Sequence, residues 1–336
     1  MSYNYFTVSA SQQRGGLWAG LFSKVSQGVN LMIISASYKT DIPAFYGKWF
    51  MNRLRAGYCK VLDSYGKKIY RADLRPEMVD GFVFWTKNIH PFLQELPTIR
   101  EMGYPFYVQY TINNYPRALE SAVIDADKAI DGARQIALQF GSNAVVWRYD
   151  TIIFSSITRP EYHLSNFQNL CQKMSGIVNE VVVSFAQTYQ KTTRNMNLAA
   201  QEFNFTWEDP DNETKLQLTK TLAGIAAGYN IQLTVCAQPE YIVPGVQEAH
   251  CIDIHRLSSI AGRQIFAELK GSRAKCACYM SRDIGEYDTC PHGCVYCYAV
   301  ENQQSALEKF KRHNPESEFL LEPAQDIPYE EVEQPD

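Results

Sequence analysis

The sequence predicts an α/β protein whose core is a complete or partial (β/α) barrel of the TIM type, followed by a C-terminal cysteine-rich segment. Short apolar runs alternate with longer amphipathic segments from Met32 to about Gly262, which is the alternation of strand and helix expected of such a barrel. No G-x-G-x-x-G turn follows any of these runs, so an open doubly wound sheet is the second choice. Seven of the nine cysteines lie between Cys236 and Cys297.

The apolar runs are rich in β-branched and aromatic residues, as expected of strands buried on both faces of a parallel sheet. Two of the runs, Tyr58–Leu62 and Cys251–Ile254, are weaker than the others. The predicted strands are Met32–Ser37, Tyr58–Leu62, Gly81–Thr86, Pro105–Thr111, Ala144–Arg148, Val181–Phe185, Ile231–Cys236 and Cys251–Ile254.

The segments between the runs include five predicted helices. Two of them start on a proline, which suits a first helical turn, and three stop directly before a glycine. The predicted helices are Pro43–Arg55, Pro91–Met102, Leu119–Phe140, Tyr162–Lys173 and Lys215–Ala227.

The ends of the chain differ from the middle. Residues 1–31 contain no acidic residue and are predicted to be a flexible extension, residues 32–270 form the barrel, and residues 271–315 form the cysteine-rich segment. Residues 316–336 contain eight acidic residues and no lysine or arginine, which predicts a disordered acidic tail. Without those eight acids, 28 acidic residues face 32 basic ones, so the formal charge of the remainder is +4 instead of −4. This balance permits an anionic substrate.

The compartment is expected to be the cytoplasm. The chain opens without the charged segment and apolar run of a secretory signal, and no stretch approaches the roughly 18 consecutive apolar residues of a membrane span. We therefore expect no membrane association, and we expect the clustered thiols to bind metal instead of forming disulfides.

The last three cysteines form the motif Cys290-Pro-His-Gly-Cys294-Val-Tyr-Cys297, a C-x₃-C-x₂-C run. This is the ligand spacing of the radical S-adenosylmethionine (SAM) enzymes, in which three thiolates hold a 4Fe–4S cluster and the fourth iron binds SAM. Zinc is the alternative, with His292 as a fourth ligand. Three soft thiolates with one open position fit iron–sulfur better, so residues 271–315 are predicted to be an iron–sulfur segment.

A second set of cysteines precedes this motif. Cys276 and Cys278 are two residues apart, so their sulfurs point the same way in an extended segment. Cys236 and Cys251 end one apolar run and begin another, and the four thiols together match the ligand count of a second 4Fe–4S cluster. The alternative is that Cys236 and Cys251 are small buried hydrophobic residues.

Polar residues end the predicted strands, where a (β/α) barrel carries its chemistry. Arg148 and Asp150 share one strand face, and with Lys87 they are the candidate catalytic residues. Lys87 and Arg148 are suited to a carboxylate or phosphate. Residues that could bind the cofactor or the substrate are Ser35, Ser37, Asp41, Thr86, Asn88, Gln109, Thr111 and Ser184.

Several motifs in order resemble domain-of-unknown-function family 1848, an uncharacterised group with a C-terminal cysteine motif like that of radical SAM enzymes. Tyr38-Lys39 departs from the two arginines that precede Thr-Asp-Ile-Pro in that family, so an anion contact there is altered. The motifs are Met32-Ile-Ile-Ser-Ala-Ser37, Thr40-Asp-Ile-Pro-Ala-Phe45, Phe84-Trp-Thr-Lys-Asn88, Trp147-Arg-Tyr-Asp150, Asp283-Ile-Gly285 and Thr289-Cys-Pro-His-Gly-Cys-Val-Tyr-Cys-Tyr-Ala299.

The position of the loop is unusual, because radical SAM enzymes carry it after the first strand and here it comes last. No Gly-Gly-Glu segment, which contacts SAM in that superfamily, follows any strand. The Cys-Val-Tyr-Cys-Tyr-Ala run is also similar to that of spore photoproduct lyase, which repairs DNA.

Three functions follow as hypotheses. The first is a radical SAM-like enzyme that uses a 4Fe–4S cluster and SAM, takes electrons from a ferredoxin or flavodoxin, and acts on a small molecule or a nucleic acid. The second is an iron–sulfur protein that transfers electrons or senses redox state without SAM. The third is a zinc-stabilised barrel that binds nucleotides or nucleic acid.

Overall fold

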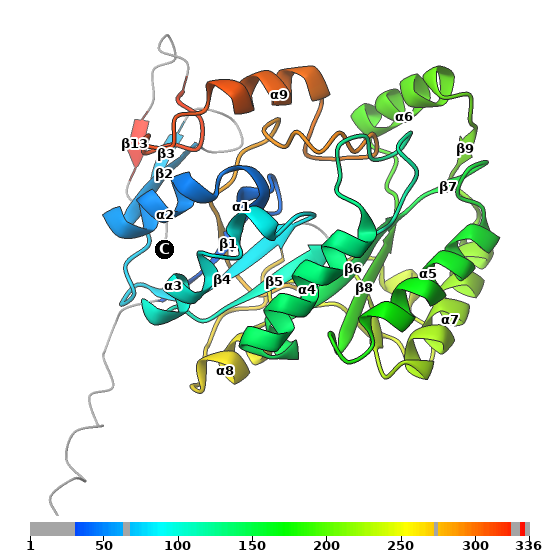
Figure 1. Cartoon of the computed structure of the whole chain (residues 1–336), viewed down its shortest axis with the longest axis horizontal. Helices are drawn as coiled ribbons and strands as arrows, with labels where there is room; N and C mark the ends of the chain where they lie inside the picture. The colour runs from blue at the N-terminus through cyan, green and yellow to red at the C-terminus, as the bar shows by residue number, and fades with distance from the viewer. Residues whose placement is uncertain (1–30, 63–67, 272–274, 324–329, 333–336) are drawn as a thin grey trace, which may run out of the picture. The chain divides into compact units, whose positions relative to one another are not determined.

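A computed structural model describes residues 31–62, 68–271, 275–323 and 330–332 of the chain. The predicted extension at residues 1–31 falls almost entirely outside these residues. The main element of the protein's fold is a sheet of eight strands, all parallel, in the order β11-β10-β8-β6-β5-β4-β1-β12 (Figure 1). The strands are β1 (Met32–Ala36), β4 (Val79–Thr86), β5 (Phe106–Thr111), β6 (Val145–Ile152), β8 (Glu180–Phe185), β10 (Gln232–Val235), β11 (Gln247–Glu248) and β12 (Arg282–Asp283).

The predicted α/β class is confirmed, and six of the eight predicted strands lie in this sheet. From β1 to β11 the strands follow one another in chain order, while β12 pairs with the other side of β1. Among the described residues β11 and β12 are the two edges of the sheet, so a closed barrel is not observed. Both edge strands have two residues, which leaves little ladder for closing the sheet.

Two predicted strands are corrected. The strand at Tyr58–Leu62 exists as β2, but it pairs antiparallel with β3 (Lys68–Asp73) in a separate three-stranded sheet completed by β13 (Glu330–Val332). The predicted strand at Cys251–Ile254 is a loop that leads into α8 (Ile254–Ala261). Asp253 ends that loop by capping the helix, because its carboxylate accepts the amide of His255 at 2.8 Å.

Helices cover one face of the parallel sheet, as Figure 1 shows for α3, α4 and α5. The predicted helix at Leu119–Phe140 is shorter than expected: it begins after Asp125, and residues 112–125 form a loop. Helix α6 was not predicted from the sequence. The helices are α1 (Ile42–Phe45), α2 (Gly47–Ala56), α3 (Leu96–Glu101), α4 (Ala126–Phe140), α5 (Pro160–Met174), α6 (Gln190–Glu202), α7 (Asn212–Gly228), α8 and α9 (Gln303–Arg312).

Alternation along the strands gives the sheet two different cores. Phe82 and Phe84 of β4 face the helices, in a large cluster of aromatic and aliphatic side chains. Val83 and Trp85 face the other side, where a smaller cluster contains Cys236, Cys251 and Cys278. The second face is therefore the one against which Cys276, Cys278 and Tyr279 pack. No helix of the described residues is long and apolar enough to cross a membrane.

The first part of the predicted acidic tail packs on the fold, contrary to the prediction of disorder. Trp49 Nε1 donates to the carbonyl of Ser317 at 3.0 Å, and Leu320 is buried. The amide of Lys60 in β2 donates to the carbonyl of Glu318 at 2.9 Å. The count of acidic residues did not reveal that Ser317 and Leu320 are buried and hold this segment on the fold.

His163 of α5 gives the fold a pH-dependent stability. It is fully buried, with Nε2 donating to the carbonyl of Ile153 at 2.9 Å and Nδ1 accepting from the Tyr149 hydroxyl at 2.8 Å. Burial lowers its pKa from 6.5 to about 4. As the pH falls, His163 is therefore protonated in the unfolded chain before it is protonated in the folded chain. The free energy of unfolding that the neutral buried imidazole contributes is present above pH 6.5 and is lost as the pH falls toward 4.

We expect one such site to remove roughly 3 kcal/mol of the free energy of unfolding between pH 7 and pH 4, at about 1.4 kcal/mol per unit of pKa. Urea unfolding of His163→Gln at both pH values should show a smaller loss than the wild type shows. Replacement of the exposed His255 by glutamine is the control. An unchanged loss in His163→Gln would refute the assignment.

Candidate functional site

The cysteine loop Cys290–Cys297 lies at the carboxyl ends of β1, β4 and β5. Asp41 follows β1, and its Oδ2 accepts the amide of Lys87 at 2.7 Å and pairs with His292 Nε2 at 2.6 Å. Residues 119–122, beyond β5, exchange backbone hydrogen bonds of 3.0 and 3.1 Å with the loop. The loop follows all eight strands of the main sheet along the chain, yet it meets the ends of three early strands.

The three loop thiols lie close enough to influence one another electrostatically. Burial raises the pKa of all three, and the charge of Lys87 opposes this rise at Cys294. Backbone amides donate to two of the sulfurs: Ala299 N lies 3.3 Å from Cys297 Sγ, and two further amides donate to Cys290. An iron–sulfur cluster fits this donor set, because iron stabilises buried thiolates and cluster sulfurs accept such N–H groups.

Lys87 forms a buried ion pair with Glu120, which was not predicted from the sequence. Lys87 Nζ lies 2.8 Å from Glu120 Oε1, and Asn113 Nδ2 donates to the same oxygen at 3.2 Å. The Tyr296 hydroxyl, from the cysteine loop, also donates to Glu120. Burial would raise the pKa of Glu120, but Lys87 and these hydrogen bonds outweigh it and lower that pKa. Glu120 is therefore a carboxylate held beside the loop.

Arg148 and Asp150, which the strand pattern placed on one face of β6, form a second ion pair there. Arg148 Nη2 lies 2.5 Å from Asp150 Oδ2, and Nη1 donates to Gln109 Oε1 at 3.2 Å. Ser184 of β8 donates to Asp150. Arg148 also stacks over the Trp85 ring, with its guanidinium carbon 5.1 Å from the centroid. The pair occupies the inner face of the sheet, where its charges neutralise each other.

Asp283 of β12 gathers the polar residues that end β1. Its carboxylate accepts from Ser35 Oγ at 2.8 Å and from Ser37 Oγ at 2.7 Å, and Lys39 Nζ lies 3.8 Å away. Gly285 approaches so closely that a Cβ there would meet Ser37 Oγ at 2.0 Å. The Asp-Ile-Gly motif thus binds the end of β1 to β12, a role that spacing alone did not reveal.

Of the predicted cofactor-binding residues, Thr86 and Asn88 lie in the turn after β4, and Thr111 lies at a recess. Thr86 Oγ1 accepts the amide of Asn88 at 2.9 Å, and Asn88 Oδ1 accepts the amide of His90 at 3.2 Å, so both stabilise the turn after β4. Thr111 lines a recess of about 400 Å³, partly open to solvent, together with Lys87 and Glu120. Thr111 therefore lies at the same recess as the Lys87–Glu120 ion pair beside the cysteine loop.

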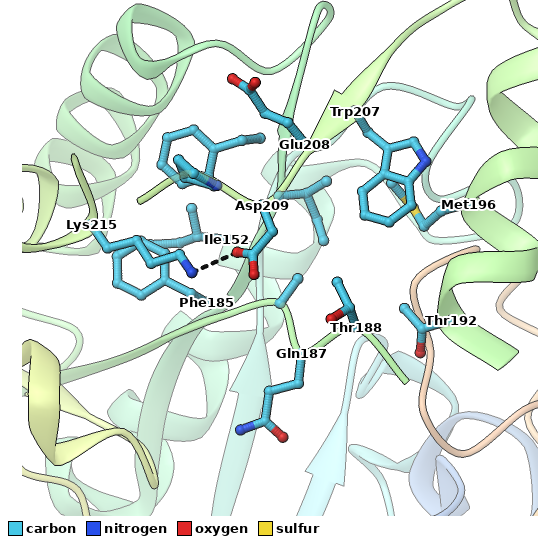
Figure 2. Close-up of a pocket in the computed structure, with 14 residues that line it drawn as sticks. Ile152, Phe185, Gln187, Thr188, Thr192, Met196, Trp207, Glu208, Asp209 and Lys215 are labelled. Carbon is cyan, nitrogen blue, oxygen red and sulfur yellow. Dashed lines mark ion pairs between the residues drawn. The ribbon is translucent and has the colours of Figure 1, made fainter. Parts of the chain in front are cut away.

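A separate hollow lies beyond the ends of β6 and β8 (Figure 2). Figure 2 shows Phe185, Trp207 and Met196 around it, with Lys215 Nζ 2.5 Å from Asp209 Oδ1 at one side. None of the predicted site residues lines it. We therefore place the candidate site at the cysteine loop and not at this hollow.

The four other cysteines of the cluster converge on the inner face of the sheet. Cys236 Sγ and Cys251 Sγ are 3.4 Å apart, and the Cys278 thiol forms hydrogen bonds with those of Cys251 and Cys276. The hydrogen bond with Cys278 lowers the pKa of Cys276 to about 6. Among the described residues, no three His, Cys, Asp or Glu side chains, here or at the cysteine loop, are spaced as ligands of one metal ion.

A family model described as "Domain of unknown function (DUF1848)" matches residues 33–299. The chain belongs to the DUF1848 family. The match runs from β1 to the end of the cysteine loop, so it includes both sets of cysteines, and it confirms the resemblance seen in the sequence motifs. No curated protein matches this DUF1848 chain.

Among solved structures, the DUF1848 chain is similar to the crystal structure of a D-hydantoinase, with 10% sequence identity and a TM-score of 0.29. The alignment covers 62% of this chain and 42% of that chain. The DUF1848 chain thus spans less than half of the length of that structure, and so slight a likeness carries no functional argument.

Proposed function

We propose that this DUF1848 chain is an iron–sulfur enzyme of the radical SAM type, with a 4Fe–4S cluster held by Cys290, Cys294 and Cys297. The observation that supports this most is the position of the loop. Although it comes last in the sequence, it lies where β1, β4 and β5 end, which is where a (β/α) barrel carries its chemistry. We also propose that the parallel sheet is a partial barrel, because its strands run in chain order.

A 4Fe–4S cluster held by Cys290, Cys294 and Cys297 would supply the one-electron reduction of S-adenosylmethionine on which radical chemistry depends. The protein's own contribution is positioning. The Asp41–His292 contact fixes the loop, and Lys87 offsets negative charge at Cys294. The Glu120 carboxylate faces the recess and is suited to binding an amino group or a polar substrate.

The cellular context fits the same proposal. No disulfide joins any of the nine cysteines, all of which lie in the part of the chain that the structure describes, and this suits the reducing cytoplasm. Cys290 and Cys297 are only partly buried, so a soluble electron donor such as a ferredoxin or flavodoxin has a short route to the cluster. The substrate is proposed to be a small molecule or a nucleic acid.

Anaerobic reconstitution followed by electron paramagnetic resonance tests the function. We expect a brown protein whose reduced spectrum changes when SAM is added, and release of 5′-deoxyadenosine with dithionite. A cluster spectrum that SAM leaves unchanged would favour electron transfer or redox sensing instead. A colourless protein with zinc bound at the loop would favour the zinc-stabilised nucleotide-binding barrel.

A further inference from the structure

Cys236, Cys251, Cys276 and Cys278 form a compact group, called here the thiol quartet. Its members come from three places in the chain: the end of β10, the loop after β11, and the segment that leads to β12. Cys236 Sγ and Cys251 Sγ are 3.4 Å apart. The Cys278 thiol forms hydrogen bonds with the thiols of Cys251 and Cys276, which connects all four. Four thiols from distant segments thus meet at one point.

The backbone around the quartet is held in place without any bound group. Tyr279 N donates to the carbonyl of Ile252 at 3.1 Å, and Lys270 N donates to the carbonyl of Cys278 at 3.0 Å. The Tyr107 hydroxyl donates to the carbonyl of Cys251 at 2.7 Å. These bonds hold the backbone at Cys251 and Cys278 in place, so the thiols need only side-chain rotations to reach a common ligand.

An arginine distinguishes the quartet from ordinary buried cysteines. Arg148 Nη1 donates to Cys251 Sγ at 3.0 Å, although Arg148 is only 4% exposed. A guanidinium inside an apolar cluster is suited to a sulfur that carries negative charge. Cys59 and Cys171, by contrast, are packed in the core between the sheet and the helices.

We propose that the thiol quartet binds one tetrahedral Zn²⁺, independently of the cluster proposed at the loop. With Zn–S bonds of about 2.3 Å, the sulfurs of a tetrahedral site lie about 3.8 Å apart, close to the contact already present. Zinc binding replaces the bonds between thiols: the four protons leave to solvent, and each sulfur becomes a ligand.

A 4Fe–4S cluster fits this position less well. Each of its cysteine sulfurs binds a different iron, so the four sulfurs would have to move apart around a cube of eight atoms. The surrounding side chains are packed against the thiols and include Tyr107, Ala249, Ile252 and Ile265. A single ion requires small rotations of the cysteines instead of a new cavity.

The site would link the two edges of the sheet. Cys236 and Cys251 adjoin β10 and β11 at one edge, while Cys276 and Cys278 precede β12 at the other. Since β11 and β12 are not paired with each other, a metal ion would add to the backbone hydrogen bond from Tyr279 to Ile252 that already joins these two segments.

Metal analysis of the full chain, purified anaerobically without added metal, tests the proposal. We expect about one zinc per chain. Cys276→Ser should lose most of this zinc, and Cys276→His should keep it, because imidazole replaces thiolate at zinc. Cys171→Ser is the control for a buried cysteine elsewhere. Circular dichroism of each variant shows whether it has folded.

Cys294→Ser separates this site from the loop: it should keep the zinc while the loop loses iron. Substitution by Co²⁺ in place of zinc should give the intense visible bands of tetrahedral cobalt thiolate, and these should be absent in Cys276→Ser. Zinc retained in a folded Cys276→Ser, no zinc in the wild type, or about eight irons per chain would each overturn the proposal.

Discussion

Replacement of Cys294 by serine is expected to remove nearly all iron from the reconstituted protein, together with any release of 5′-deoxyadenosine. Cys294 is buried at the centre of the loop, next to Lys87, and a serine hydroxyl is a poor ligand for iron. Iron and sulfide analysis with a visible spectrum measures the loss. Cys171→Ala, on the buried face of α5, should leave the spectrum unchanged.

The same variant separates chemistry from folding. The loop is also held by the Asp41–His292 contact and by backbone bonds to residues 119–122, none of which needs the sulfur. We therefore expect the far-ultraviolet circular dichroism of metal-free Cys294→Ser to match that of the metal-free wild type. A folded variant that retains a full set of iron would refute the assignment of Cys294 as a ligand.

Lys87→Met is expected to destabilise the metal-free protein by about 3–5 kcal/mol, the usual cost of removing one partner of a buried ion pair. The side chain of Glu120 is only 4% exposed, so its charge would remain in the interior without a cation. Urea unfolding measures the change. The matched control is Lys173→Met, which breaks an exposed pair with Asp127 and should cost less than about 1 kcal/mol.

A double-mutant cycle completes this prediction. Glu120→Gln removes the charge but keeps an oxygen that can accept from Asn113 and Tyr296. Adding it to Lys87→Met should restore part of the lost stability, because no buried charge then remains unpaired. Strictly additive effects of the two substitutions would show that the ion pair contributes nothing specific.

The sequence predicted the strands of the parallel sheet because their evidence is local: each is a short apolar run, and β1, β4, β5, β6, β8 and β10 all lie where such a run was found. The partner of a strand is not local information. Tyr58–Leu62 was correctly predicted to be a strand, but only the structure showed that it pairs with Lys68–Asp73 outside the main sheet.

The candidate site was predictable to a similar extent. Cysteine spacing identified the loop, and the end of a strand identified Lys87. Glu120 was missed because it lies 33 residues from Lys87 and within what the pattern indicated was a helix. Leu119 beside it is apolar because it packs under the loop near Tyr296, and not because it belongs to a helix face.

The contact between Asp41 and His292 spans 251 positions of the chain. During synthesis from the N-terminus, β1, β4 and β5 leave the ribosome long before the cysteines that meet their ends. Under the proposed function, a cofactor held by this loop would bind after the three strands beside it have been made, so formation of these strands would precede loading of the cofactor.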